Sequence, residues 1–171
     1  MGNVSVINNI ESFFKLADAI VDKVELIKES EDKVILIADD EPLTFELIKE
    51  YFGNANLHYK ILRAETGRKA YNLAVSESPD LIITDWIMPE FDGPDLIKKL
   101  KENNATKDIP VILITGGVFP EKQFNKVFFE GAIDYIRKPL DETELITRVT
   151  TWLSLNKPLK DLKRLTPYPE Q

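Results

Sequence analysis

Short apolar runs alternate with amphipathic stretches of helical length between residues 33 and 155. The runs have the length of strands, and most end at or just before a polar side chain. Apolar runs of this length, separated by helices, are typical of parallel strands that are buried on both faces. The predicted strands are Val34–Ala38, Tyr59–Arg63, Leu81–Asp85, Ile109–Thr115 and Ile133–Ile136.

The stretches between these runs carry the usual start and stop signals of helices. Pro42 suits the first turn of a helix that ends at Gly53-Asn54, and Thr66 is a suitable cap for the next helix. Pro79 ends that second helix, because the residue before a proline disfavours helical geometry. The predicted helices span about 42–54, 66–78, 94–103, 120–130 and 140–155.

Five strand–helix units in about 120 residues predict an α/β fold with helices on both faces of a parallel sheet. The expected form is a flavodoxin-like, doubly wound, five-stranded sheet with strand order 2-1-3-4-5. In this order the first and third strands are neighbours at the topological switch point, where such folds bind their ligands. The sequence therefore predicts a site at the carboxyl ends of these strands.

Two extensions flank the predicted domain at 33–155. The segment 1–32 spaces its apolar residues alternately three and four apart, as in the seam of a short coiled coil. The alternative is a single amphipathic helix that packs its apolar stripe onto the domain. The segment 156–171 holds three prolines among basic residues, which predicts a mostly irregular, mildly basic tail. The apolar positions of the first segment are Ile10, Phe13, Ala17, Ile20, Val24 and Ile27.

Composition narrows the functional classes. The net charge of −7 argues against a general nucleic-acid binder, which needs a basic face. The chain has no cysteine, which excludes thiol chemistry and fits a cytoplasmic location, and His58 is its single histidine. No apolar run is long enough to span a membrane, and no secretory signal is evident at the N-terminus.

Polar residues with complementary chemistry follow four of the predicted strands. Asp39-Asp40 follow the first strand, Asp85 ends the third, and Thr115 ends the fourth. Lys138-Pro139 follow the fifth, and Pro139 would hold the turn beyond Lys138 through a trans or a cis peptide bond. Carboxylates, a hydroxyl and an ammonium at one sheet edge suit a divalent cation and a phosphoryl group.

Each of these residues also has an ordinary structural interpretation. Asp39 and Asp40 could cap a helix, Thr115 could be a strand-end hydroxyl, and Lys138 could be a surface lysine. Those interpretations do not explain why all of them coincide at one edge of the sheet. The coincidence predicts a shared site, in which mutual repulsion raises at least one carboxylate pKa and Lys138 pairs with Asp85.

Residues 33–155 resemble the receiver domain of bacterial two-component response regulators. Each matching motif is weak alone, but all four occur in order and each lies at a strand end. The motifs are Ile-Ala-Asp-Asp-Glu-Pro at 37–42, Pro-Asp-Leu-Ile-Ile-Thr-Asp-Trp-Ile-Met-Pro-Glu-Phe-Asp-Gly at 79–93, Pro-Val-Ile-Leu-Ile-Thr at 110–115, and Gly-Ala-Ile-Asp-Tyr-Ile-Arg-Lys-Pro at 131–139.

The resemblance implies a role for each acidic residue. Asp85 would accept a phosphoryl group from a phosphohistidine, supplied by a histidine kinase or a phosphotransfer protein. Asp40 would bind Mg2+ directly and Asp39 through water, with Asp85 and the backbone carbonyl of Ile87 as further ligands.

The resemblance also implies a switch that responds to phosphorylation. Thr115 and Tyr135 would be the switch pair, and Lys138 would hold a phosphoryl oxygen. The chain departs from the usual receiver pattern at Gly116-Gly117, where two glycines should loosen the following loop. Ile87 and Gly117 also offer no polar side chain that could orient a hydrolytic water.

Three functional hypotheses follow from the sequence. The first is a phosphorylatable switch that acts on an unidentified partner, and it is not a conventional enzyme. The second is a constitutive interaction module, or homodimer, that uses segment 1–32 or the face of the fourth helix, fifth strand and last helix. The third, a haloacid-dehalogenase type hydrolase, needs a second aspartate at position 87, which is isoleucine.

The setting of the domain is a separate question. The tail after residue 155 is short for a DNA-binding or cyclase domain, which argues against direct action on DNA. The domain would then be a stand-alone receiver, or a piece of a hybrid kinase or of a larger regulator.

Overall fold

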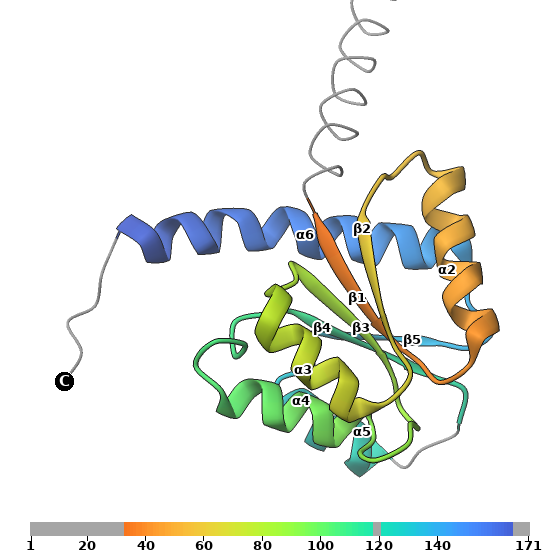
Figure 1. Cartoon of the computed structure of the whole chain (residues 1–171), viewed down its shortest axis with the longest axis horizontal. Coiled ribbons are helices and arrows are strands. Elements are labelled where there is room, and N and C mark those ends of the chain that lie inside the picture. The colour runs from red at the N-terminus through yellow and green to blue at the C-terminus, as the bar shows by residue number, and fades with distance from the viewer. Residues whose placement is uncertain (1–32, 118–120, 166–171) are drawn as a thin grey trace, which may run out of the picture.

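The computed structural model describes residues 33–117 and 121–165, which form a five-stranded parallel sheet with helices on both faces (Figure 1). The strand order is β2-β1-β3-β4-β5, and every neighbouring pair is parallel, so the predicted flavodoxin-like order 2-1-3-4-5 is confirmed. The strands are β1 Val34–Ala38, β2 Lys60–Ala64, β3 Leu81–Asp85, β4 Val111–Thr115 and β5 Asp134–Arg137. The helices are α2 Pro42–Asn54, α3 Gly67–Glu77, α4 Gly93–Glu102, α5 Glu121–Phe129 and α6 Glu142–Leu165.

Alternate side chains of the strands build two separate cores. On β1, Leu36 and Ala38 point into the core that the sheet shares with α3, α4 and α5. Ile35 and Ile37 point into the core under α2 and α6. Because successive side chains on a strand face opposite sides, a continuous apolar run fills both cores at once.

Most predicted boundaries agree with the structure to within two residues. β4 begins at Val111 and not at Ile109, because Pro110 has no N–H to donate and the Ile109 N–H bonds to the Thr106 carbonyl at 3.0 Å. Thr66 caps α3 as predicted, with its side-chain oxygen accepting from the Lys69 N–H at 3.2 Å. Asp92 caps α4 in the same way, accepting from the Asp95 N–H at 2.9 Å.

The predicted end of the last helix at Leu155 is wrong, as is the irregular tail over 156–165. α6 continues to Leu165, and Pro158 lies within it. An interior proline costs one backbone hydrogen bond, but the leucines at 159, 162 and 165 keep helical spacing beyond it. The residues after 165 and the predicted coiled-coil or amphipathic segment 1–32 lie outside the described residues.

A close backbone approach holds the β3–α4 loop against the sheet edge. The Gly93 N–H donates to the Trp86 carbonyl at 2.8 Å, and a Cβ on Gly93 would overlap the Asp85 carbonyl oxygen. A Cβ on Gly67 would likewise overlap the Phe91 carbonyl oxygen. These glycines let the loop pack directly beside the end of β3, which positions Asp85.

In the described ranges, none of the helices is both long and apolar enough to span a bilayer.

Candidate functional site

The carboxyl ends of β1, β3, β4 and β5 meet at one edge of the sheet. The register aligns Ala38 with Thr84 and Asp85 with Ile114, so the polar residues that follow these strands lie close together. A cavity of about 460 Å³ opens there, at the predicted switch point. It is lined by Asp40, Glu41, Asp85, Trp86, Ile87, Gly116, Gly117 and Lys138; we call it the Lys138 cavity.

The Lys138 ammonium lies between three carboxylates. Its Nζ is 3.2 Å from Asp85 Oδ1, 3.2 Å from Asp39 Oδ2 and 3.2 Å from Glu41 Oε2. The predicted Lys138–Asp85 pair is therefore confirmed, and one lysine joins acidic groups from the ends of β1 and β3. Burial of this lysine disfavours its charged form, but the Asp85 and Asp39 carboxylates outweigh burial and raise its pKa.

Asp39 and Asp85 are both buried, with 1% and 9% of their surfaces exposed. Asp39 Oδ1 accepts from the Glu41 N–H at 2.8 Å, and Asp85 Oδ2 accepts from the Ile87 N–H at 3.3 Å. Burial raises the pKa of both carboxyls in spite of Lys138, so the predicted direction is confirmed. The cause differs from the prediction, because desolvation contributes more to the pKa of Asp85 than its repulsion by Asp39 does.

The acidic groups suit a hard cation but do not form a complete cage. Asp40 is exposed and lines the Lys138 cavity, and the backbone of Ile87 lies beside the Asp85 carboxylate. Throughout residues 33–117 and 121–165, no three acidic or histidine side chains are spaced as a ready metal site. Two buried carboxylates with raised pKa nevertheless provide the oxygen ligands and the excess negative charge that favour a divalent cation.

Thr115 and Tyr135 lie on the same face of the sheet. Leu113 is the register partner of Tyr135, and Thr115 is two residues beyond Leu113 on β4. The buried Thr115 hydroxyl accepts from the Gly117 N–H at 3.3 Å. The half-buried Tyr135 ring packs edge-on against Phe128 of α5, with centroids 5.9 Å apart. The two residues thus border the same β4–β5 and α5 region.

The loops after β4 and β5 meet at Lys138. The Lys138 N–H donates to the Thr115 carbonyl at 2.8 Å, and the Lys138–Pro139 peptide bond is cis. A Cβ on Gly116 would make ordinary contact with Lys138 Cδ at 3.6 Å. The glycine at 116 is therefore not required by space, in contrast to Gly93.

Sequence reasoning assigned no role to Glu41, which lines the Lys138 cavity together with Trp86. Glu41 is exposed, and a hydrogen bond from Lys138 is the largest cause that lowers its pKa. Its position two residues after Asp39 was visible in the 37–42 motif, but only the fold brings it to a lysine 97 residues later. Trp86 is 7% exposed and directly follows Asp85, which makes it a natural reporter of the site.

Comparison with known proteins places this geometry among signalling domains. The model of the response regulator receiver domain matches residues 35–150. The phosphate regulon transcriptional regulatory protein PhoB of Pseudomonas aeruginosa is 38% identical over 119 residues, covering 68% of this chain and 50% of PhoB. Histidine kinase P4 of Formosa agariphila is 37% identical over 148 residues, covering 84% of this chain and 10% of the kinase. The chain thus spans half of one of these relatives and a tenth of the other.

A solved structure shows the same fold. The receiver domain of the sensor histidine kinase PA1611 from Pseudomonas aeruginosa PAO1 superposes with a TM-score of 0.64 at 22% identity. The match covers 71% of this chain and 98% of that domain. That structure contains a magnesium ion coordinated in its active site cleft.

Neutralising Asp85 should stabilise the fold at neutral pH. The raised pKa of Asp85 means that the folded state binds the proton more tightly than the unfolded state, so the ionised form costs stability above both pKa values. Asp85→Asn removes this cost, and its advantage should shrink as pH falls through the folded-state pKa and the wild-type carboxyl takes up a proton. Urea denaturation of both proteins from pH 4 to pH 7.5 measures the difference; a variant that is less stable at pH 7 would contradict the expectation.

Proposed function

Because the chain belongs to the response regulator receiver domain family, we propose that it is a phosphoacceptor switch with Asp85 as the acceptor. The single observation that carries this proposal is the position of the Asp85 carboxylate, which lines the Lys138 cavity with Lys138 Nζ 3.2 Å away. A nucleophile paired with a cation is the arrangement that phosphoryl transfer requires.

The proposed reaction moves a phosphoryl group from a protein phosphohistidine to Asp85. An Asp85 oxygen forms a bond to phosphorus while the bond from phosphorus to the imidazole nitrogen breaks, and that nitrogen keeps the electron pair. The Lys138 ammonium contacts Asp85 and is positioned by Asp39 and Glu41. It can therefore stabilise the negative charge on the phosphoryl oxygens during transfer. Catalysis of this kind depends mainly on positioning and charge neutralisation.

A divalent cation, Mg2+ by the chemistry of its oxygen ligands, would neutralise phosphoryl charge when bound. Asp85, Asp39, Asp40 and the backbone carbonyl of Ile87 are the groups of this chain that would hold it. The first two are buried with raised pKa, and Asp40 lines the same cavity. The receiver domain of PA1611 binds magnesium in its cleft, which supports the assignment.

The signal would leave the site through Thr115 and Tyr135. The Thr115 hydroxyl would turn from the Gly117 N–H to the new phosphoryl oxygens, drawing in the loop after β4. Tyr135 would then change its burial against Phe128, which alters the surface of α5, β5 and α6. This surface already exposes Phe129 and Leu155, 92% and 52% accessible, and could bind the output partner or a second copy of the chain.

The donor of the phosphoryl group would be a histidine kinase or a phosphotransfer protein. One relative is itself a histidine kinase, so a receiver within a hybrid kinase is an alternative setting for the same chemistry. A constitutive interaction module remains the alternative from a different class. Dimer affinity that does not change with beryllofluoride, a phosphoryl mimic, would favour that alternative.

Labelling from acetyl phosphate with Mg2+ tests the proposal. The wild type should acquire an acid-labile label that Asp85→Asn lacks. Lys138→Ala should label at least about tenfold more slowly, because it removes the cation beside the nucleophile. Thr115→Ala should label near the wild-type rate but lose the change at Tyr135, measured by tyrosine-ring NMR. Absence of label on the wild type, or normal labelling and switching in both variants, would contradict the proposal.

Mg2+ affinity should depend on Asp40. Asp40→Ala removes a carboxylate from the Lys138 cavity and should weaken Mg2+ binding at least about tenfold, measured by Trp86 fluorescence. Asp95→Ala is the matched control, since it removes the same charge from the exposed surface of α4. Equal affinities for all three proteins would show that Asp40 is not a ligand.

The phosphorylated form should decay slowly. Hydrolysis needs a water held in line with the phosphorus–oxygen bond, yet Ile87 and Gly117 line the cavity without a polar side chain to hold it. The double variant Ile87→Asn/Gly117→Gln should decay about tenfold faster, a change of about 1.4 kcal/mol in barrier. Ile87→Val is the control and should decay like the wild type. Loss of label from the wild type within seconds of donor removal would refute slow decay.

A further inference from the structure

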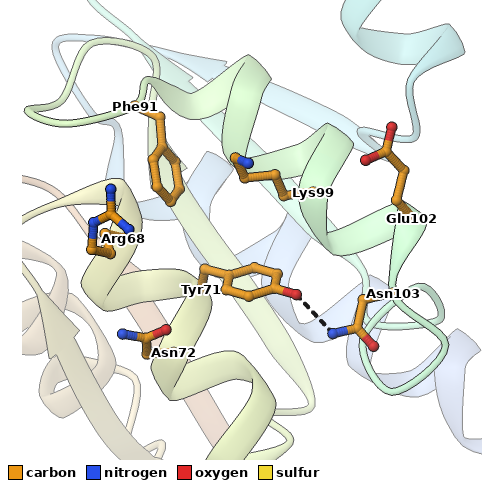
Figure 2. A pocket seen from close by; sticks show the side chains of 7 residues that line it. All are labelled: Arg68, Tyr71, Asn72, Phe91, Lys99, Glu102 and Asn103. Atoms are coloured by element: carbon orange, nitrogen blue, oxygen red, sulfur yellow. Dashed lines mark hydrogen bonds between the residues drawn. The ribbon is translucent and has the colours of Figure 1, made fainter.

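A second hollow lies between α3 and α4, away from the Lys138 cavity (Figure 2). We call it the α3–α4 groove. Its volume is about 360 Å³, which falls in the range of small-molecule sites. It shares no lining residue with the Lys138 cavity, so mutation can separate the two. The groove is lined by Arg68, Tyr71, Asn72, Phe91, Lys99, Glu102 and Asn103.

Two facing helical stripes build the groove. α3 contributes residues 68, 71 and 72, which have the i, i+3, i+4 spacing of one helix face. α4 contributes residues 99 and 102, and Asn103 is its C-cap. Below these stripes the small side chains of Ala70 and Ala74 are fully buried and bring the helices close. Most lining side chains therefore come from packed helices, with Phe91 supplied by the loop before α4 and Asn103 by the cap after it.

Two cations gather around the Phe91 ring. Lys99 Nζ lies 5.4 Å and the Arg68 guanidinium carbon 5.8 Å from its centroid. Arg68 Nε donates to Glu90, which leaves its terminal nitrogens for another acceptor. In the described part of the chain, no carboxylate lies within ion-pair distance of Lys99. Arg68 is paired with Glu90, so the charge at this end of the groove that has no carboxylate partner among the described residues is the Lys99 ammonium.

The Tyr71 hydroxyl is a neutral donor at the Asn103 end of the groove (Figure 2). The Tyr71 hydroxyl oxygen accepts from Asn103 Nδ2 at 2.8 Å, so its own proton is available to a further acceptor. The Asn103 carbonyl oxygen in turn accepts from the Ala105 N–H at 2.9 Å, which fixes this amide. Figure 2 shows the Tyr71 ring lying across the groove, where it offers a flat apolar surface.

We propose that the α3–α4 groove binds a small molecule that carries one anionic oxygen group, phosphate or carboxylate, beside an aromatic ring. The anionic group takes the Lys99 ammonium and the terminal nitrogens of Arg68 beside Phe91, and the ring stacks on Tyr71. Glu102 lies at the opposite end from Arg68 in Figure 2, so a second anion at the far end of the ligand is repelled.

NMR titration of the 15N-labelled full chain in EDTA tests the proposal. EDTA removes the divalent cations that phosphorylation of Asp85 would need, so the probes cannot react there. Phenyl phosphate and benzoate are the probes for the two anionic groups, with a dissociation constant on the order of 1 mM expected for ligands of this size. Amide and side-chain shifts should centre on α3, α4 and Phe91. 4-Carboxyphenyl phosphate should bind several-fold more weakly than phenyl phosphate.

Matched variants make the test specific. Lys99→Gln should weaken binding about tenfold, the value of one charge-assisted hydrogen bond. Lys98→Gln removes the same charge from a neighbouring exposed residue outside the groove and should bind like the wild type. Binding of either probe that Lys99→Gln weakens and Lys98→Gln leaves unchanged supports the site, and the probe that binds identifies the anionic group. No saturable shift with either probe, shifts centred on Lys138, or equal loss in both variants would overturn the proposal.

Discussion

The contact on which the candidate site depends is the Lys138 ammonium held between Asp85, Asp39 and Glu41. Two of these carboxylates are buried at the ends of neighbouring strands, where ionised oxygens without a cation would destabilise the fold. Lys138 offsets part of that cost, but the pKa of Asp39 and Asp85 stays raised. The edge therefore remains electrostatically unsatisfied, which is the property that a site for a cation and a phosphoryl group requires.

The same contact links distant parts of the chain. Lys138 follows β5, and its backbone N–H bonds to the Thr115 carbonyl at the end of β4, while its side chain reaches β1 and β3. A new charge on Asp85 changes the balance among these partners, since one ammonium cannot keep three equal contacts and a phosphoryl group. In the proposed function, the competition at Lys138 and the hydroxyl of Thr115 would connect chemistry at β3 to the β4–β5 side of the molecule.

The sheet and the residues around Lys138 could be predicted because the governing signals are local. The apolar runs locate the strands, and Pro, Gly and Thr residues mark where the helices begin and end. The parallel strand order then brings Asp39, Asp85 and Thr115 to one edge of the sheet. Glu41 could not be assigned, because an exposed glutamate near a helix start looks the same whether or not a lysine faces it. The extension of α6 past Leu155 was missed because Pro158 was weighed as a stop signal. An interior proline removes one hydrogen bond and crowds the carbonyl four residues earlier, but the helix continues through it.

The segment between β3 and α4 belongs to both hollows of the molecule. Trp86 at its start lines the Lys138 cavity, and Phe91 near its end lines the α3–α4 groove. The segment is held at both ends, since the Trp86 N–H bonds to the Ile114 carbonyl at 2.9 Å and the Trp86 carbonyl accepts from the Gly93 N–H. Glu90 within it has a left-handed backbone with φ of 71°, and the Gly67 N–H bonds to the Pro89 carbonyl at 3.3 Å. The α3–α4 groove and the Lys138 cavity therefore share one tethered stretch of backbone, which joins Phe91 to Trp86 beside Asp85.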